Sequence, residues 1–92
     1  MKVRYVISKQ RRLILTTAAG CVTFDDIRGN QDRLLADPDF EASFDQVIDM
    51  TTATKFDISA DDARVLAKRR IFSPESRRAF VATGAISSGS GA

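Results

Sequence analysis

The sequence predicts a small α/β domain in which the elements follow the order β-β-α-β-α-β and form a mixed, mostly parallel sheet. Two observations carry this prediction. Apolar and polar residues alternate near the start of the chain, as in a strand with one buried face, and apolar residues later recur at helical spacing between short apolar runs. Strands separated by helices form parallel sheets, whereas a short polar turn gives an antiparallel hairpin. The 92 residues allow one domain, which we expect to span residues 1–83.

The first two strands are expected to form a hairpin. Residues 3–7 alternate with the period of two that is typical of a strand. Residues 9–12 are polar and predict a turn, and the β-rich run 13–17 predicts the second strand. We expect this strand to end at Gly20.

The first helix is predicted directly after this hairpin. Thr23 is followed three residues later by Asp26, which is typical of a capping box at a helix start. Apolar residues then recur at helical spacing as far as Leu35. Asp37 precedes Pro38, and proline disfavours the helical conformation in the residue before it, so the helix is expected to end there.

The remaining chain is expected to hold two strands and one helix. The apolar run 46–50 lies between two helical patterns and therefore predicts a central parallel strand. Residues 51–58 are expected to connect it to a second helix over 59–70. The run 79–83 predicts the last strand, and the small residues 84–92 predict a flexible tail.

The charged residues are arranged in blocks along the chain. Residues 1–22 contain five basic residues and no acid, residues 23–62 contain eleven acids and three bases, and residues 63–92 contain six bases and one acid. Such blocks can steer a partner or bring two copies together through complementary patches. Solvated faces are the alternative interpretation, and the sequence leaves both open.

The sequence also indicates the compartment in which the protein is located. No apolar run approaches the roughly 20 residues that span a bilayer, so we expect no membrane insertion. The N-terminus lacks the apolar stretch and cleavage site of a signal peptide. The single cysteine, Cys21, cannot form an internal disulfide, which agrees with a reducing compartment. The sequence therefore predicts a cytoplasmic protein.

Four segments carry a resemblance to a known family: GCVTFDDI, LLADPDF, VIDM and RRAFVAT. Over residues 3–83 their pattern resembles the small bacterial proteins called SpoIIAA-like, or STAS/SEC14-type, domains. The resemblance implies an α/β fold that begins β-β-α-β-α-β and a binding or regulatory role. It also implies that the usual C-terminal part of such domains is missing from this chain.

Ser59 is the one residue for which the resemblance suggests regulation. In related anti-sigma-factor antagonists, a serine at the corresponding place is phosphorylated, which makes Ser59 a candidate phosphoacceptor. The residues themselves favour another role, because Ser59 and Asp62 match a capping box. Asp57 and Asp61 would also repel a phosphate. We therefore predict that Ser59 caps the second helix.

A basic cluster near the end of the chain is a candidate binding patch. It consists of Lys68, Arg69, Arg70, Arg77 and Arg78. Such a cluster can contact the phosphates of a nucleic acid, although Phe72 is its sole aromatic candidate for base stacking. The chain has no histidine, no glycine-rich phosphate loop and no paired-cysteine motif. The sequence therefore predicts no catalytic residue, no metal site and no cofactor.

These observations predict a non-enzymatic binding or regulatory domain that acts on a protein partner or a small apolar ligand. A nucleic-acid-binding module that uses residues 68–78 is the alternative. The last strand is apolar and is expected to lie at an open edge of the sheet. Because open apolar edges invite pairing with another chain, the sequence also predicts a homo-oligomer, most simply a homodimer.

Overall fold

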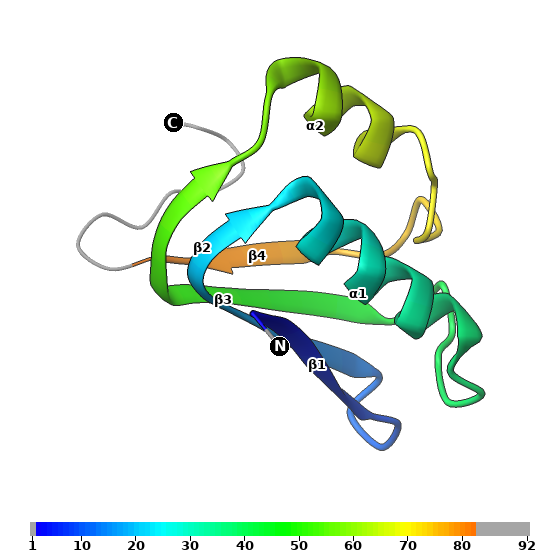
Figure 1. Ribbon diagram of the computed structural model, residues 1–92. Helices are drawn as coiled ribbons and strands as arrows, with labels where there is room; N and C mark the ends of the chain where they lie inside the picture. The colour runs from blue at the N-terminus through cyan, green and yellow to red at the C-terminus, as the bar shows by residue number, and fades with distance from the viewer. Residues whose placement is uncertain (1, 83–92) are drawn as a thin grey trace.

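Four strands form one sheet in the spatial order β1-β2-β3-β4 (Figure 1). Their bounds are Val3–Ser8 for β1, Leu13–Thr23 for β2, Asp45–Asp57 for β3 and Arg78–Val81 for β4. β1 is antiparallel to β2, and β2, β3 and β4 are parallel to one another. The sheet is therefore mixed and mostly parallel, as predicted. The computed structural model describes residues 2–82, so the expected tail 84–92 lies outside the described residues.

Two helices join the parallel strands, α1 over Phe24–Ala36 and α2 over Ala60–Ala67. α1 begins with the predicted capping box, in which the side chains of Thr23 and Asp26 each accept a hydrogen bond from the backbone N–H of the other residue. It ends with Asp37 at the C-cap, as expected from the following proline. Neither helix in the described part of the chain is long and apolar enough to cross a membrane.

β2 and β3 are both longer than the sequence predicted. β2 continues through Gly20 to Thr23, because Gly20 adopts a left-handed φ of 69° next to a shift in register with β3. A glycine in this conformation accommodates a bulge and lets the strand continue. The prediction that 51–58 is a connection is wrong: these threonine-rich residues pair with the extension of β2 and belong to β3 as far as Asp57.

α2 is shorter than the sequence predicted. The helix ends at Ala67 and not at Arg70, which adopts a left-handed φ of 50°. β4 begins one residue earlier than expected, at Arg78, and lies at an edge of the sheet, as predicted for the last strand. Thr83, the expected last residue of this strand, lies outside the described residues.

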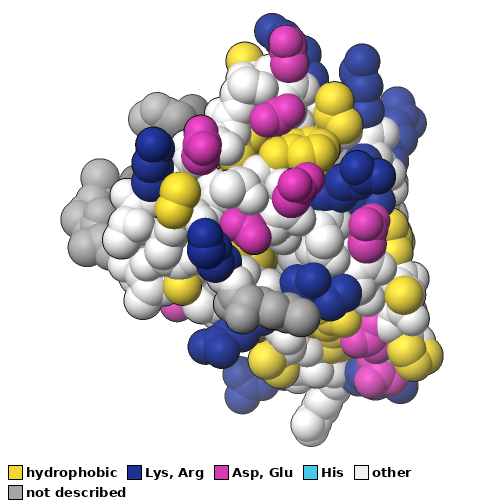
Figure 2. Space-filling model, viewed as in Figure 1, with side chains coloured by type: hydrophobic (Ala, Val, Ile, Leu, Met, Phe, Trp, Pro, Cys, Tyr) yellow, Lys and Arg dark blue, Asp and Glu magenta, His cyan; other side chains and the backbone are white. Residues whose placement is uncertain are grey.

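The core lies between one face of the sheet and α1. Two groups of buried apolar side chains form it, one of Ile14, Leu34, Phe44 and Ile71 and the other of Val3, Ala18 and Val22. α1 packs against β1 and β2, whereas α2 packs against α1 and buries none of its own residues. α2 therefore covers the sheet without closing onto it (Figure 1). In the view of Figure 2, acidic and basic side chains are interspersed across the surface.

Candidate functional site

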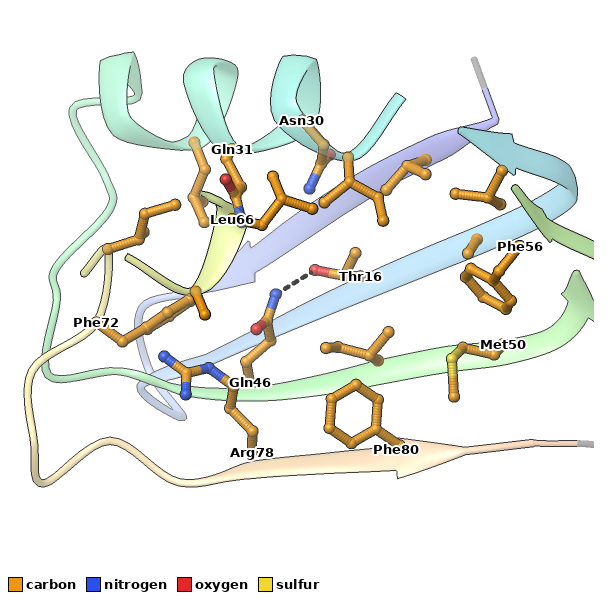
Figure 3. Close-up of a pocket in the computed structure, with 18 of the residues that line it drawn as sticks. Thr16, Asn30, Gln31, Gln46, Met50, Phe56, Leu66, Phe72, Arg78 and Phe80 are labelled. Atoms are coloured by element: carbon orange, nitrogen blue, oxygen red, sulfur yellow. Dashed lines mark hydrogen bonds between the residues drawn. The ribbon is translucent and has the colours of Figure 1, made fainter. Parts of the chain in front are cut away.

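A cavity of about 410 Å³ lies where α2 stands off the sheet. β2, β3 and β4 form its floor, and α1, α2 and the segment that follows α2 form its walls (Figure 3). Small-molecule sites in proteins are clefts of similar volume, about 300–1,000 Å³, with mostly apolar walls and a few polar groups. The cavity is therefore the candidate functional site.

Most of the cavity wall is apolar. The alternation of β3 places residues 46, 48 and 50 on its covered face, so that Ile48 and Met50 both line the cavity. Phe80 of β4 is the register partner of Ile48 and extends this apolar floor. Phe56 lies near the far end of β3 (Figure 3), and Leu66 is contributed by α2. This part of the cavity suits a hydrocarbon or aromatic group.

A polar group of side chains occupies the other end of the floor. The side-chain amide nitrogen of Gln46, Nε2, donates a hydrogen bond of 2.8 Å to Oγ1 of Thr16, and both residues are buried. Arg78 is the register partner of Gln46 on β4, and its guanidinium lies beside the Gln46 amide (Figure 3). The same guanidinium stacks over the ring of Phe72 at 4.5 Å. The cavity thus has a polar end and an apolar end.

Asn30 of α1 adds an unsatisfied polar group to the wall opposite this floor. The residue is buried, and its side-chain amide points toward the cavity (Figure 3). Its Oδ1 accepts no hydrogen bond from any residue of the described chain. A buried acceptor without a partner destabilises a protein by about 1–3 kcal/mol, so Oδ1 is expected to accept a hydrogen bond from a water molecule or from a bound ligand.

The charged residues that line the cavity are all basic. Arg70 and Arg78 line it, and no aspartate or glutamate among residues 2–82 does so. An anion in the cavity would therefore meet no lining carboxylate. Arginine binds carboxylates through paired, charge-assisted hydrogen bonds.

The five residues of the predicted basic cluster make different contacts, and all but Arg69 are exposed. Arg69 turns back to α1, where its guanidinium pairs with Asp32 and donates a hydrogen bond of 3.0 Å to Oε1 of Gln31. Arg77 forms an ion pair of 3.2 Å with Asp45. Hydrogen bonding from Arg69 lowers the pKa of Asp32, and the backbone N–H and then the guanidinium of Arg77 lower the pKa of Asp45.

The other members of the cluster have separate surroundings. Arg78 and Arg70 line the cavity, and Lys68 is exposed at the C-cap of α2. Two of the five basic residues are thus held by carboxylates of the protein and two belong to the cavity. Nucleic-acid binding through residues 68–78 stays a prediction.

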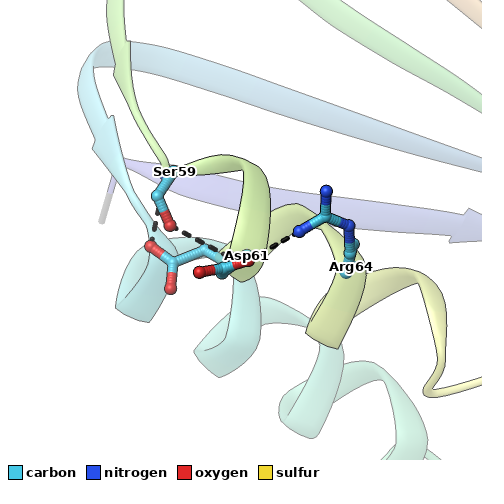
Figure 4. A network of polar contacts seen from close by, with 4 residues as sticks. Ser59, Asp61 and Arg64 are labelled. Atoms are coloured by element: carbon cyan, nitrogen blue, oxygen red, sulfur yellow. Dashed lines mark hydrogen bonds and ion pairs between the residues drawn. The ribbon is translucent and has the colours of Figure 1, made fainter.

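Ser59 caps α2 as predicted. Its Oγ accepts a hydrogen bond of 3.0 Å from the backbone N–H of Asp62, and the Asp62 carboxylate accepts one of 3.3 Å from the backbone N–H of Ser59. Asp61 beside them forms an ion pair of 2.6 Å with Arg64 (Figure 4). These contacts explain Ser59 as a helix cap, and its role as a phosphoacceptor stays a prediction.

The cap can be tested by substitution. Ser59→Ala is expected to lower the free energy of unfolding by about 1 kcal/mol, because it leaves the Asp62 N–H without its side-chain acceptor. Ser59→Asp is expected to be nearly neutral, since aspartate caps helices about as well as serine. Urea unfolding of both variants measures the difference. Equal, negligible effects of the two changes would contradict the capping role.

The sequence did not identify the cavity. Thr16 and Gln46 carry a signal that could have been used, because each is a polar residue at a position that the alternation of its strand turns toward the core. Asn30 gives a similar signal within the buried stripe of α1. Only the pairing of β2 with β3 and of β3 with β4 brings Gln46, Thr16 and Arg78 together.

Comparison with known proteins adds no further information about the site. No protein-family model matches the chain, and no curated protein or solved structure is significantly similar to it. The resemblance to SpoIIAA-like domains therefore stays a prediction. The observed element order agrees with it, but an element order shared by many unrelated proteins does not establish a family.

Proposed function

We propose that this protein is a non-enzymatic binding domain that holds a small apolar molecule with an acidic group in the cavity between the sheet and the helices. The observation that carries the proposal is the composition of the cavity wall. Its side chains are mostly apolar, and its charged members among the described residues are Arg70 and Arg78. A ligand with an apolar body and one carboxylate matches both parts.

The apolar end supplies most of the expected affinity. Burial of each CH₂ group of a ligand stabilises the complex by about 0.8 kcal/mol, and the aliphatic and aromatic side chains of the floor offer such burial along β3 and β4. This contribution is not directional. It favours any slender apolar group that fits, and it does not by itself decide the class of ligand.

The polar end supplies the specificity. The Arg78 guanidinium is held by the ring of Phe72, and the Gln46 amide is held by Thr16, so both groups are oriented before a ligand arrives. A carboxylate placed beside Arg78 accepts charge-assisted hydrogen bonds, which contribute about 1.5–3 kcal/mol each. A second polar group on the ligand, such as a hydroxyl, would satisfy the Asn30 amide.

A matched series of ligands tests this proposal. Octanoate, octanol and octylamine share one apolar chain and differ in the charge of the head group. We expect octanoate to bind about tenfold or more tightly than octanol, because one charge-assisted hydrogen bond is worth at least that factor, and octylamine to bind most weakly. Titrations followed by amide chemical shifts give the three dissociation constants and show whether residues of the cavity respond.

The Arg78→Gln variant shows whether the head group is bound by this residue. It is expected to remove the preference for octanoate while leaving the affinity for octanol unchanged. Arg77→Gln is the matched control, since the neighbouring Arg77 side chain is 87% exposed and does not line the cavity. Equal binding of octanoate and octanol to the unmodified protein would contradict the acidic group. Failure of all three molecules to perturb cavity residues would contradict the binding function itself.

A further inference from the structure

The face of the sheet opposite the cavity carries an apolar row that crosses all four strands. Val6, Leu15, Val47 and Ala79 are successive register partners, so their side chains lie side by side from β1 to β4. Both helices lie on the other side of the sheet, and no helix of residues 2–82 covers this row. Val6 is 67% exposed and Leu15 is 43% exposed. A row of this kind in direct contact with water is typical of an interaction surface.

The neighbouring row on the same face carries opposite charges. It consists of Arg4, Thr17, Asp49 and Val81, again as successive register partners. Arg4 on β1 and Asp49 on β3 therefore flank β2 at the same level. Arg4 is exposed and forms no ion pair with another described residue. The hydroxyl and backbone N–H of Thr51 donate to Oδ1 of Asp49 and lower the pKa of this carboxyl group, which keeps it charged.

We propose that this face binds a second copy of the same chain, related to the first by a two-fold axis that runs along β2. A two-fold rotation about this axis moves a residue from the β1 side of β2 to the β3 side. It leaves the position of that residue along the strand direction unchanged. It places β1 of each copy over β3 of the other. Leu15 then meets Leu15 of the second copy at the axis, and Val6 meets its Val47.

The same operation also matches the charges. Arg4 of each copy comes to lie over Asp49 of the other, so the contact contains two equivalent ion pairs beside its apolar centre. Stacked sheets lie about 10 Å apart, and two extended side chains can span this distance. The surface is thus complementary to itself, which is the requirement for a two-fold homodimer. Because the surface is complementary to itself, a second copy of the chain is the partner that fits this face.

In this interface the two sheets pack face to face. The sequence predicted a different contact, in which the open edge formed by the last strand pairs with another chain. β4 has four residues in the described chain and offers a short edge. The proposed contact uses side chains of β1, β2 and β3, and it includes the opposite charges of Arg4 and Asp49. The cavity lies on the other face, so ligand binding and association use separate surfaces and can be tested separately.

Sedimentation equilibrium tests the apolar centre. The unmodified protein is expected to have the mass of a dimer at micromolar concentration, and Leu15→Glu is expected to have the mass of a monomer, because it places two like charges at the axis. Val65→Glu is the matched control, an identical gain of charge at a comparably exposed apolar residue of α2. A monomeric unmodified protein overturns the proposal, and so does a dimer that survives Leu15→Glu.

A charge exchange tests the orientation of the two copies. Arg4→Asp and Asp49→Arg each put like charges face to face at both positions, so each variant alone is expected to dissociate with a dissociation constant raised about tenfold or more. An equimolar mixture of the two variants recovers opposite charges at both positions and is expected to form a heterodimer. Circular dichroism of each variant shows that the fold is retained. A mixture that associates no better than its components overturns the proposed axis.

Discussion

Phe44→Ala is expected to lower the free energy of unfolding by about 3–5 kcal/mol, the largest effect of any single substitution considered for this protein. Phe44 is 1% exposed and packs with Ile14, Leu34 and Ile71. Arg12 also stacks on its ring, at 5.2 Å from the centroid. Alanine would leave a cavity at the point where the loop after α1 enters β3.

The size of the domain makes this loss severe. A folded chain of this length has a total stability of about 5–14 kcal/mol, so Phe44→Ala removes a large share of it. Urea unfolding followed by circular dichroism measures the change. Phe56→Ala is the matched control, since Phe56 is 45% exposed on β3, the strand that Phe44 directly precedes, and its removal is expected to change stability by about 1 kcal/mol or less. Equal losses for the two variants would contradict the assignment of Phe44 to the core.

Leu34→Ala is expected to lower the free energy of unfolding by about 2–5 kcal/mol. Leu34 is 1% exposed and is the buried apolar residue through which α1 joins the main core group. Without it, α1 keeps the packing of Ile27 and its hydrogen bonds, among them the one that Arg33 donates to the backbone of β1. The helix is therefore expected to loosen before the sheet.

Leu35→Ala is the control for this prediction, because Leu35 follows Leu34 directly and is 48% exposed. It is expected to be close to neutral in stability. Amide hydrogen exchange of the two variants shows where the loss occurs. Faster exchange in α1 than in β2 is expected for Leu34→Ala. A uniform increase across the sheet and the helix would contradict a local attachment of α1.

The sequence by itself determined the type and order of the elements. The alternation of residues 3–7, the capping boxes that begin at Thr23 and Ser59, and the proline that follows Asp37 are all local signals. Each acts through backbone geometry or through hydrogen bonds between residues a few positions apart. For this reason they could be interpreted without knowledge of the fold, and the structure confirms them.

Only the tertiary structure decided the lengths of β2 and β3. The residues after Gly20 and after residue 50 include types that favour strands but do not alternate regularly between apolar and polar side chains. They form strands because they pair with each other across more than thirty positions of the chain. The helix over 59–70 was predicted too long for a related reason: Arg70 leaves helical geometry as the chain turns back toward the core at Ile71.

The candidate site was likewise decided by the tertiary structure. Two of its residues, Arg70 and Arg78, were predicted to belong to a basic patch. They line an apolar cavity because of the order of the strands and because α2 stands off the sheet. The same strand order aligns Arg4 with Asp49 on the opposite face. Local periodicity in the sequence determines the face of the sheet on which a residue lies. The neighbours of that residue on the face depend on the register between strands, and this register is set by contacts between residues far apart in the sequence.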